Sequence, residues 1–446
     1  MQITLFPADF HYSPKWYIFK ESELGKIHDS INWDGLSELL PKKKTLRGSP
    51  SWLPSKGIFG LMFLKHYTGL SDEKLVDRFN TDWAMQIFCG VLLLENESIK
   101  DNSFVSRIRS YLAKHVSMEQ MQQQMLEKWK PNLANSHVML ADATAYESHL
   151  RFPTDVKLLW ECCLWLWGKA IPDVCKCFKL KIPRSKFDQQ KKKYLTYSKL
   201  RRKSRRKTRA RKRSILHLVS KGLESLQQLL NQTKGGKLSG TEYARIRIIR
   251  QILRQQTQLY NYPGVKIKDR IVSLAKPYVR PIIRGKENKD VEFGMKVHMN
   301  QVDGINVIEY ASFDNFNECK RLKVSVLKHV KQFDKCTHIS ADRIYPTNEN
   351  RRFCTGRKII TNFDRKGPKK EDKQTKQMKG ILNKARSTSM EGSFGNEKNH
   401  YLLRKIKARS KDTEMIWLFF GVFTANSVKM VKKMTKEKSP PKKRAA

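Results

Sequence analysis

Residues 136–142 read SHVMLAD, a short apolar run that contains a β-branched residue and ends in an acid. Its length and composition predict a strand buried in a sheet. A second run, CTHISAD at residues 336–342, alternates apolar and polar residues and also ends in an aspartate. An acid at the exit of a buried strand is a common position for a functional carboxylate, although a helix cap or a turn uses the same residue. The two runs predict an α/β sheet with Asp142 and Asp342 at strand ends.

Further strand patterns lie between and after these runs. Apolar residues alternate from Phe293 to Met299, and Asp303-Gly304 then forms a strong hairpin signal ahead of the apolar residues at 305–308. KIITNF, 358–363, predicts one more strand. Residues 366–384 are rich in lysine with few apolar anchors, so we expect a loop there.

The two ends of the chain have different patterns. Residues 1–133 predict helices, and the run 69–91 suggests two short ones with a break near residues 80–82, which fits either a helix-turn-helix or an ordinary packing domain. From 389 to 433 the pattern is helical, and its apolar stretch MIWLFFGVFTAN predicts burial. The basic, proline-containing tail 434–446 is predicted to be disordered.

The middle of the chain is strongly basic. Positions 179–213 hold eighteen Lys or Arg and a single acid, Asp188. Two series of apolar residues with 3,4 spacing follow, at 216–230 and 246–260, and the glycines at 235 and 236 separate them; this predicts an antiparallel helical hairpin. A charge run is often only a solvated face, but this density favours contact with nucleic acid. The candidate DNA-binding residues are Arg201, Arg202, Arg205, Arg206 and Arg209.

The composition agrees with a polyanionic partner. Lys and Arg number 89 against 42 Asp and Glu, giving a net charge of +47. Like charges repel in a compact fold, so this excess indicates DNA or another nucleic acid, with an anionic membrane surface as the weaker alternative. The eight cysteines fit neither a disulfide framework nor a zinc site. Trp160, Trp165 and Trp167 could stack on bases but are more typical of a core.

No targeting segment is evident in the sequence. The first residues lack a signal peptide, and the longest apolar run, 158–167, is too short to span a bilayer. We therefore expect a cytoplasmic, nucleoid-associated protein with no membrane partner.

A third acid completes a candidate site. Glu391 begins a predicted helix, and Lys398, seven residues later, shares its face. Taken singly, Asp142, Asp342 and Glu391 are each more often structural than catalytic. Together, in a basic protein, they predict an oxygen-ligand site for Mg²⁺, or Mn²⁺, of the kind in which two ions promote phosphoryl transfer.

Four blocks of sequence carry a resemblance to a known family. They are ADATAYESHLRFPTDVKLLW (141–160), RPIIRGKENKDVEFGMKV (280–297), ADRIYPTNENRRF (341–353) and SMEGSFGNEKNHYLLRKIKAR (389–409). In order and spacing they resemble the first-aspartate, RGK, second-aspartate and glutamate-helix motifs of DDE-type transposases from bacterial insertion sequences. Residues 60–112 also resemble the helical N-terminal region of these transposases.

The resemblance implies an RNase H-like catalytic core at 134–155 plus 276–433. A helical N-terminal DNA-binding domain would occupy 1–133, and a basic helical-hairpin insertion 156–275. Asp142, Asp342 and Glu391 would be catalytic and metal-binding, and Lys398 would contact DNA phosphate. The related pattern has an arginine four residues before the glutamate; Ser387 stands there, and Arg386 is offset by one. Glu397 is a rival third carboxylate with less of the motif around it.

The function implied is DNA transposition. Such a protein binds terminal inverted repeats, cleaves the phosphodiester and joins the 3′-hydroxyl end to target DNA, as a homodimer or higher oligomer in the synaptic complex. Two alternatives remain open: a catalytically inactive DNA-binding relic, and an RNase H-like RNA-processing factor.

Overall fold

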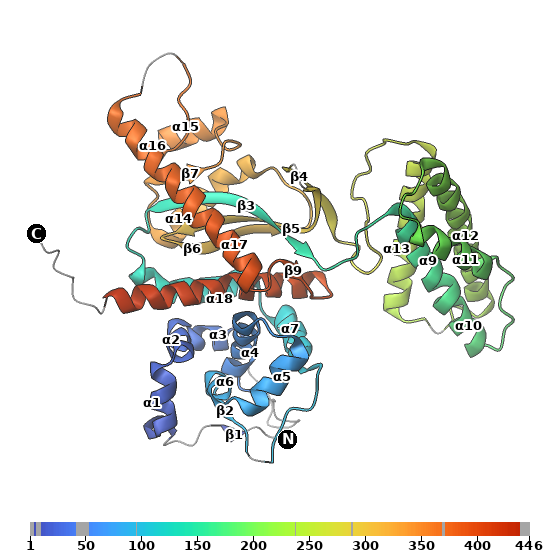
Figure 1. Ribbon diagram of the computed structural model, residues 1–446, viewed down its shortest axis with the longest axis horizontal. Coiled ribbons are helices and arrows are strands. Elements are labelled where there is room, and N and C mark those ends of the chain that lie inside the picture. Colours follow the sequence, from blue (N-terminus) through green and yellow to red (C-terminus); the bar gives the residue numbers. More distant parts are fainter. Residues whose placement is uncertain are drawn as a thin grey trace, which may run out of the picture. The chain divides into compact units, whose positions relative to one another are not determined.

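The chain forms two compact units. The computed structural model describes residues 4–5, 10–41, 53–94, 96–236, 238–286, 289–367 and 371–437 (Figure 1). The first unit comprises residues 1–149, 295–312 and 316–446, and the second comprises 150–294 and 313–315. The helices that we expected as a separate N-terminal domain therefore share a unit with the sheet. The expected insertion boundaries, 156 and 275, both fall inside the second unit.

Eight helices make up the N-terminal part of the described chain, together with a short antiparallel pair of strands, β1 (Thr4–Leu5) and β2 (Val91–Leu92). The helices are α1 (Pro14–Glu21), α2 (Glu23–Ser30), α3 (Trp33–Glu38), α4 (Ser55–Thr68), α5 (Asp72–Thr81), α6 (Trp83–Phe88), α7 (Phe104–His115) and α8 (Met118–Trp129). Asp82 ends α5, and its side chain accepts hydrogen bonds from the first backbone N–H groups of α6. The predicted break near residues 80–82 is confirmed.

The sheet of the first unit is mixed. Its strands are β3 (Val138–Ser148), β5 (Lys289–Val302), β6 (Ile305–Ser312), β7 (His338–Ala341), β8 (Ile360–Thr361) and β9 (Lys405–Ile406). β3, β7 and β8 run parallel, and β5 and β6 form the predicted hairpin, whose turn residues Asp303 and Gly304 both have positive φ. β3 is longer than predicted, so Asp142 lies inside the strand rather than at its end.

Helix α18 (Lys411–Glu437) lies between this sheet and the N-terminal helices (Figure 1). Its apolar stretch is buried as predicted. Phe420 meets Phe63 of α4 edge to face, and Phe423 stacks on Trp129 at the end of α8. The N-terminal helices α4 and α8 therefore share one core with α18. α18 continues past residue 434, where we expected the tail to begin; residues 438–446 lie outside the described residues.

Three more helices pack around the sheet: α14 (Leu322–Phe333), α15 (Asn348–Gly356) and α16 (Lys373–Ala385). The expectation of a loop at 366–384 is wrong for α16. Asp372 caps this helix by accepting from the backbone N–H of Thr375, and Leu382 is its buried anchor. Lys373, Lys376 and Lys384 are exposed, whereas Lys379 pairs with Glu371. The helical pattern predicted for 389–433 is also interrupted, because β9 separates α17 (Glu391–His400) from α18.

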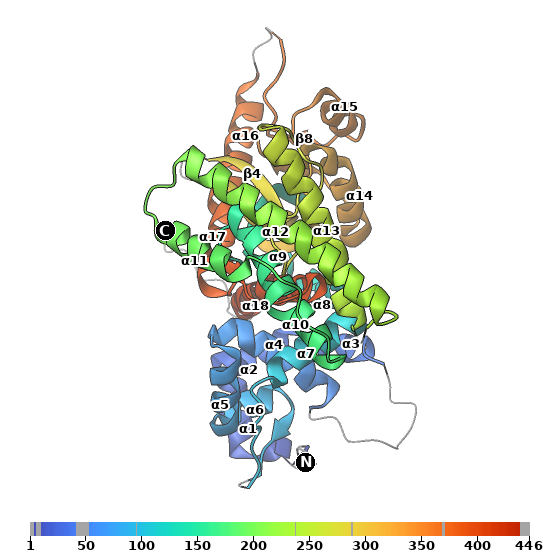
Figure 2. The ribbon, with the colours of Figure 1, turned by 90° about the vertical axis from the view of Figure 1, so that its right-hand side faces the viewer.

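The second unit is mainly helical. Its helices are α9 (Asp155–Trp165), α10 (Ile171–Cys177), α11 (Phe187–Lys199), α12 (Arg205–Gln232) and α13 (Gly240–Asn261), and β4 (Arg280–Lys286) pairs with the first half of β5. Figure 2 shows α12 and α13 side by side, as the hairpin prediction required. All three tryptophans are buried here, and Trp160 stacks on Phe187 and Tyr194. Their burial in this structure supports the interpretation that they belong to the core.

Candidate active site

Parallel strand register brings Asp142 and Asp342 next to each other. β3 and β7 pair Ala141 with Ala341, and the next residue on each chain is the aspartate. The side chain of Asn362 donates to the carbonyl oxygen of Ala341 (2.9 Å) and accepts from its backbone N–H (3.0 Å), which fixes the end of β7. Two acids 200 positions apart in sequence are thus placed by one pair of strands.

The guanidinium of Arg386 joins these two acids to the third. Its Nη1 lies 3.0 Å from Oδ2 of Asp142 and 3.2 Å from Oε1 of Glu391, and its Nη2 lies 3.6 Å from Oδ1 of Asp342. Half of the Asp342 side chain and 54% of that of Glu391 are exposed, against 15% for Asp142. The structure therefore gathers all three predicted carboxylates on one cation, open to solvent on one side.

A π-helical turn, Arg386–Met390, sets the position of Arg386. It links α16 to α17, and the backbone N–H of Glu391 donates to the carbonyl of Arg386, five residues back. Residues five apart therefore lie on one face, as residues four apart do in an α-helix. The turn accounts for the one-residue offset from the family pattern, because it returns Arg386 to the side of Glu391.

Asp142 is the carboxylate whose environment is most unusual. Burial raises its pKa to about 6, and the nearby charges of Asp342 and Glu318 act in the same direction. A hydrogen bond from the backbone N–H of Ala143 (2.8 Å) and the charge of Arg386 oppose the rise. The positive charge of Arg386 therefore favours the ionised form of this carboxyl group.

Lys398, a residue of α17, lies beside strand β3, which also carries Asp142. Its Nζ donates to Oγ1 of Thr144 (3.0 Å) and sits 5.5 Å from the ring centre of Tyr146. Asp142, Thr144 and Tyr146 alternate along β3 and so share one face. Since Glu391 and Lys398 both reach this face, α17 runs along β3, with a carboxylate and an ammonium group presented to it.

Glu397 has a different role from the other acids. It is buried; the hydroxyl of Tyr146 donates to one of its carboxylate oxygens, and Nδ2 of Asn306 donates to the other at 2.5 Å. Burial raises the pKa of this carboxyl. In this structure it fastens α17 to β3 and β6 and does not join the cluster around Arg386, so the geometry gives no support to Glu397 as the third carboxylate.

The basic residues predicted to bind DNA are in the second unit. Arg201 and Arg202 lie between α11 and α12, Arg205, Arg206 and Arg209 lie on the first turns of α12, and all five are exposed. A half-buried acid nearby is paired: Asp155 accepts from Lys212 (3.0 Å), Arg270 (2.7 Å) and Gln256 (3.1 Å), joining α9 to α12 and α13. Sequence reasoning did not assign Asp155 this role.

The donor set of the cluster suits a divalent cation. Three carboxylates supply hard oxygen ligands of the kind that Mg²⁺ and Mn²⁺ prefer. Within the described ranges, no three His, Cys, Asp or Glu side chains are already grouped to hold one metal ion. In the cluster, a guanidinium lies among the carboxylates. The residues therefore fit such an ion by their chemistry, provided that Arg386 moves aside.

The N-terminal helices are the part of the chain that resembles a known family. Residues 15–111 match the family model "Transposase domain (DUF772)". The transposase domain begins in α1, ends in α7 and includes most of the region, 60–112, whose resemblance was noted above. Comparisons with curated proteins and with solved structures gave no match. The match supports a transposase of the insertion-sequence type.

Among the described residues, no helix is both long and apolar enough to cross a bilayer.

Proposed function

We propose that this protein is a DNA transposase that binds terminal inverted repeats, cleaves the DNA phosphodiester and transfers the 3′-hydroxyl end to target DNA by a two-metal DDE mechanism. The convergence of Asp142, Asp342 and Glu391 on Arg386 carries the proposal. The resemblance assigns these acids to an RNase H-like core, and the transposase domain at 15–111 supports the general role.

The carboxylates would hold Mg²⁺ or Mn²⁺, which when bound would activate an attacking hydroxyl and stabilise charge on the scissile phosphate. In the free protein, Arg386 offsets the repulsion among the three acids. Once released from them, its guanidinium can donate two parallel hydrogen bonds to a phosphate. Lys398, at the other end of the same face of α17, is the second proposed phosphate contact.

A hollow of about 390 Å³ lies beside the cluster. It is lined by Asp342 and Arg386 together with Arg343, Lys384, Asp364 and other residues. Its wall carries three cations and two aspartates, and the cations suit a phosphodiester that approaches Asp342.

The rival functions lack a comparable observation. A DNA-binding relic has no need of a buried carboxylate with a raised pKa, because burying a charge is costly unless it is used or compensated. The match to a transposase domain favours DNA over an RNA substrate.

The experiment measures nicking and binding of repeat-end DNA in parallel. Asp142→Ala, Asp342→Ala and Glu391→Ala should each abolish nicking yet retain the gel shift, because affinity comes mainly from phosphate contacts elsewhere. Glu349→Ala, on the exposed side of α15, is the matched control and should nick normally. Chelation by EDTA should stop nicking by the parent protein. Full nicking by any of the three variants would remove that residue from the site.

A further inference from the structure

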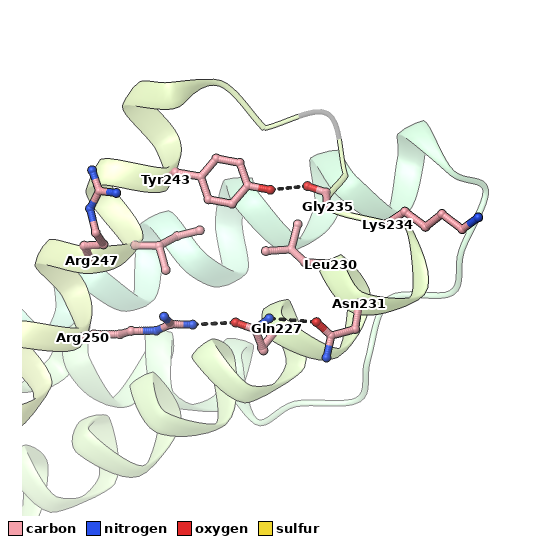
Figure 3. Close-up of a pocket in the computed structure, with 9 residues that line it drawn as sticks. Gln227, Leu230, Asn231, Lys234, Gly235, Tyr243, Arg247 and Arg250 are labelled. Carbon is pink, nitrogen blue, oxygen red and sulfur yellow. Dashed lines mark hydrogen bonds between the residues drawn. The ribbon is translucent and has the colours of Figure 1, made fainter.

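A hollow of about 480 Å³ lies at the tip of the helical hairpin formed by α12 and α13 (Figure 3). The end of α12, the turn after it and the first half of α13 enclose it. Its lining residues are Gln227, Leu230, Asn231, Lys234, Gly235, Tyr243, Ile246, Arg247 and Arg250. Three of these are cations and none is an acid.

A chain of hydrogen bonds engages side-chain acceptors of this hollow. Nη2 of Arg250 donates to Oε1 of Gln227 (2.6 Å), and Nε2 of Gln227 donates to Oδ1 of Asn231 (2.9 Å) (Figure 3). Each amide oxygen thus already accepts one hydrogen bond. The amide N–H groups of Asn231 and the remaining N–H groups of Arg250 can donate to a ligand. Tyr243 also donates its hydroxyl to the carbonyl of Gly235, which engages another acceptor.

The positive charge at the tip is not neutralised by neighbouring acids. Glu224 accepts from Ser220 (2.8 Å), and Glu242 caps α13 through Ser239 and faces Lys169. Among the described residues, neither Lys234 nor Arg247 forms an ion pair. A hollow with surplus donors and uncompensated cations suits an anion.

The arginines are not needed to cap α12. The backbone N–H of Thr233 donates to the carbonyl of Leu229 (3.0 Å), and that of Gly235 donates to the carbonyl of Leu230 (2.7 Å). The last carbonyls of the helix are thus satisfied by the turn itself. Complementing the helix dipole would account for one nearby cation, but not for three around a hollow.

We propose that this hollow binds a phosphate group of the DNA backbone. That the anion belongs to DNA rests on the proposed function. The site and the arginines at 201–209 lie at opposite ends of α12, which is 28 residues long. At 1.5 Å per residue the two ends are roughly 40 Å apart. That is close to one turn of duplex DNA, about 35 Å. One duplex can therefore meet cations at both ends of α12.

The test compares two double variants of the full chain that lose equal charge. Lys234→Gln with Arg247→Gln changes the hollow, and Lys221→Gln with Arg254→Gln removes two exposed cations from the same helices outside it. Affinity for a labelled duplex is measured by fluorescence anisotropy across a salt series. Each phosphate contact contributes about 0.9 to the slope of log affinity against log salt, so the hollow variant should lose about 0.9 unit of slope and the control almost none.

Three other results would overturn the proposal. Equal slopes for all proteins would mean that these cations touch no DNA, and equal losses in both variants would mean a diffuse charge effect. Thermal stabilisation of the parent protein, but not of the hollow variant, by inorganic phosphate, with unchanged DNA slopes, would assign the hollow to a free phosphate ligand. Nicking of repeat-end DNA is scored separately, so a protein that fails to nick but shows the expected slopes would lose the proposed function and keep this site.

Discussion

The carboxyl group of Asp142 sits on an interior strand with little solvent around it, whereas those of Asp342 and Glu391 are half exposed. Burial raises the pKa of Asp142, and the positive charge of Arg386 opposes that rise.

Asp142 should make the affinity for a divalent cation depend on pH. Its pKa in the folded chain is about 6, so the carboxyl group is protonated at lower pH and must lose its proton to bind a cation. Titration with Mn²⁺ followed by electron paramagnetic resonance should show affinity falling up to about tenfold per pH unit below 6. Asp142→Asn should bind weakly with no such dependence. Equal affinity of the parent protein at pH 5 and pH 7 would contradict this.

Raising the pH should strengthen cation binding by Asp142 but should lower the stability that this group gives the cation-free protein. Because its pKa is raised from 3.8 to about 6, the folded chain binds more protons than the unfolded chain between these values. The free energy of unfolding of the cation-free protein should therefore fall as the pH rises through this window. Urea unfolding at pH 4.5 and pH 7 would measure the contribution, as the part of the change that Asp142→Asn lacks.

Replacing Arg386 should affect cation binding and catalysis in opposite directions. Arg386→Gln removes the guanidinium that competes for the carboxylates, so Mn²⁺ should bind the free protein several-fold more tightly. Nicking should fall, because the proposed phosphate contact is lost. Lys376→Gln, an exposed cation on α16 that does not line the hollow beside Asp342 and Arg386, is the control and should change neither strongly. A loss of both cation affinity and nicking in Arg386→Gln would indicate a merely structural arginine.

The candidate acids were predictable at the level of single residues, but their common partner was not. Strand patterns put Asp142 and Asp342 on a sheet, and the motif singled out Glu391. The position of Arg386 depends on a π-helical turn, and no local pattern in residues 386–390 predicts such a turn. Contacts between positions 142 and 386 depend on tertiary packing, which periodicity cannot supply.

At the scale of elements, α17 is held in place by buried polar bonds. Glu397 accepts from Tyr146 on β3 and from Asn306 on β6. Glu397→Ala should lower the free energy of unfolding by about 1–3 kcal/mol, since two buried donors lose their acceptor. Glu397→Gln should cost less, because one amide oxygen remains. Chemical denaturation would measure both; a neutral Glu397→Ala would mean that packing alone holds the helix.

The π-helical turn gives a second prediction for this element. Deleting Ser387 should convert the turn to regular α-helix and place the arginine four residues before the glutamate, so folding and nicking should be retained. Deleting Gly380 from the regular helix α16 is the control, because it rotates the buried Leu382 by about 100° and should destabilise the fold. Comparable damage from both deletions would mean that the extra residue does not act as an insertion.

Element types were easier to predict than their lengths. The hairpin at Asp303 and the pair α12–α13 followed from turn residues and 3,4 spacing. β3 was predicted too short because its polar residues beyond 142 face the candidate site and the buried Glu397 network, and so break the apolar pattern. α16 was missed because one buried leucine anchors a helix that is otherwise charged.

At the scale of the whole molecule, the main feature is the excess of positive charge, which is evident in both the sequence and the structure. Replacing Arg201, Arg202, Arg205, Arg206 and Arg209 by Ala should flatten the slope of log DNA affinity against log salt by roughly 4 to 5 units if each contacts one phosphate. Specific and random DNA should weaken alike, because phosphates carry no sequence information. An unchanged slope would mean that these exposed arginines remain solvated in the complex.

The order of the elements along the chain has a consequence during synthesis. Asp142 leaves the ribosome 249 residues before Glu391, because almost all of the second unit is encoded between them. At about 5–20 residues per second this is a delay of roughly 12–50 s. α18, which joins the sheet to the N-terminal helices, arrives later still. The helices of the second unit can fold during the delay, whereas the cluster of acids cannot assemble until Glu391 has been made.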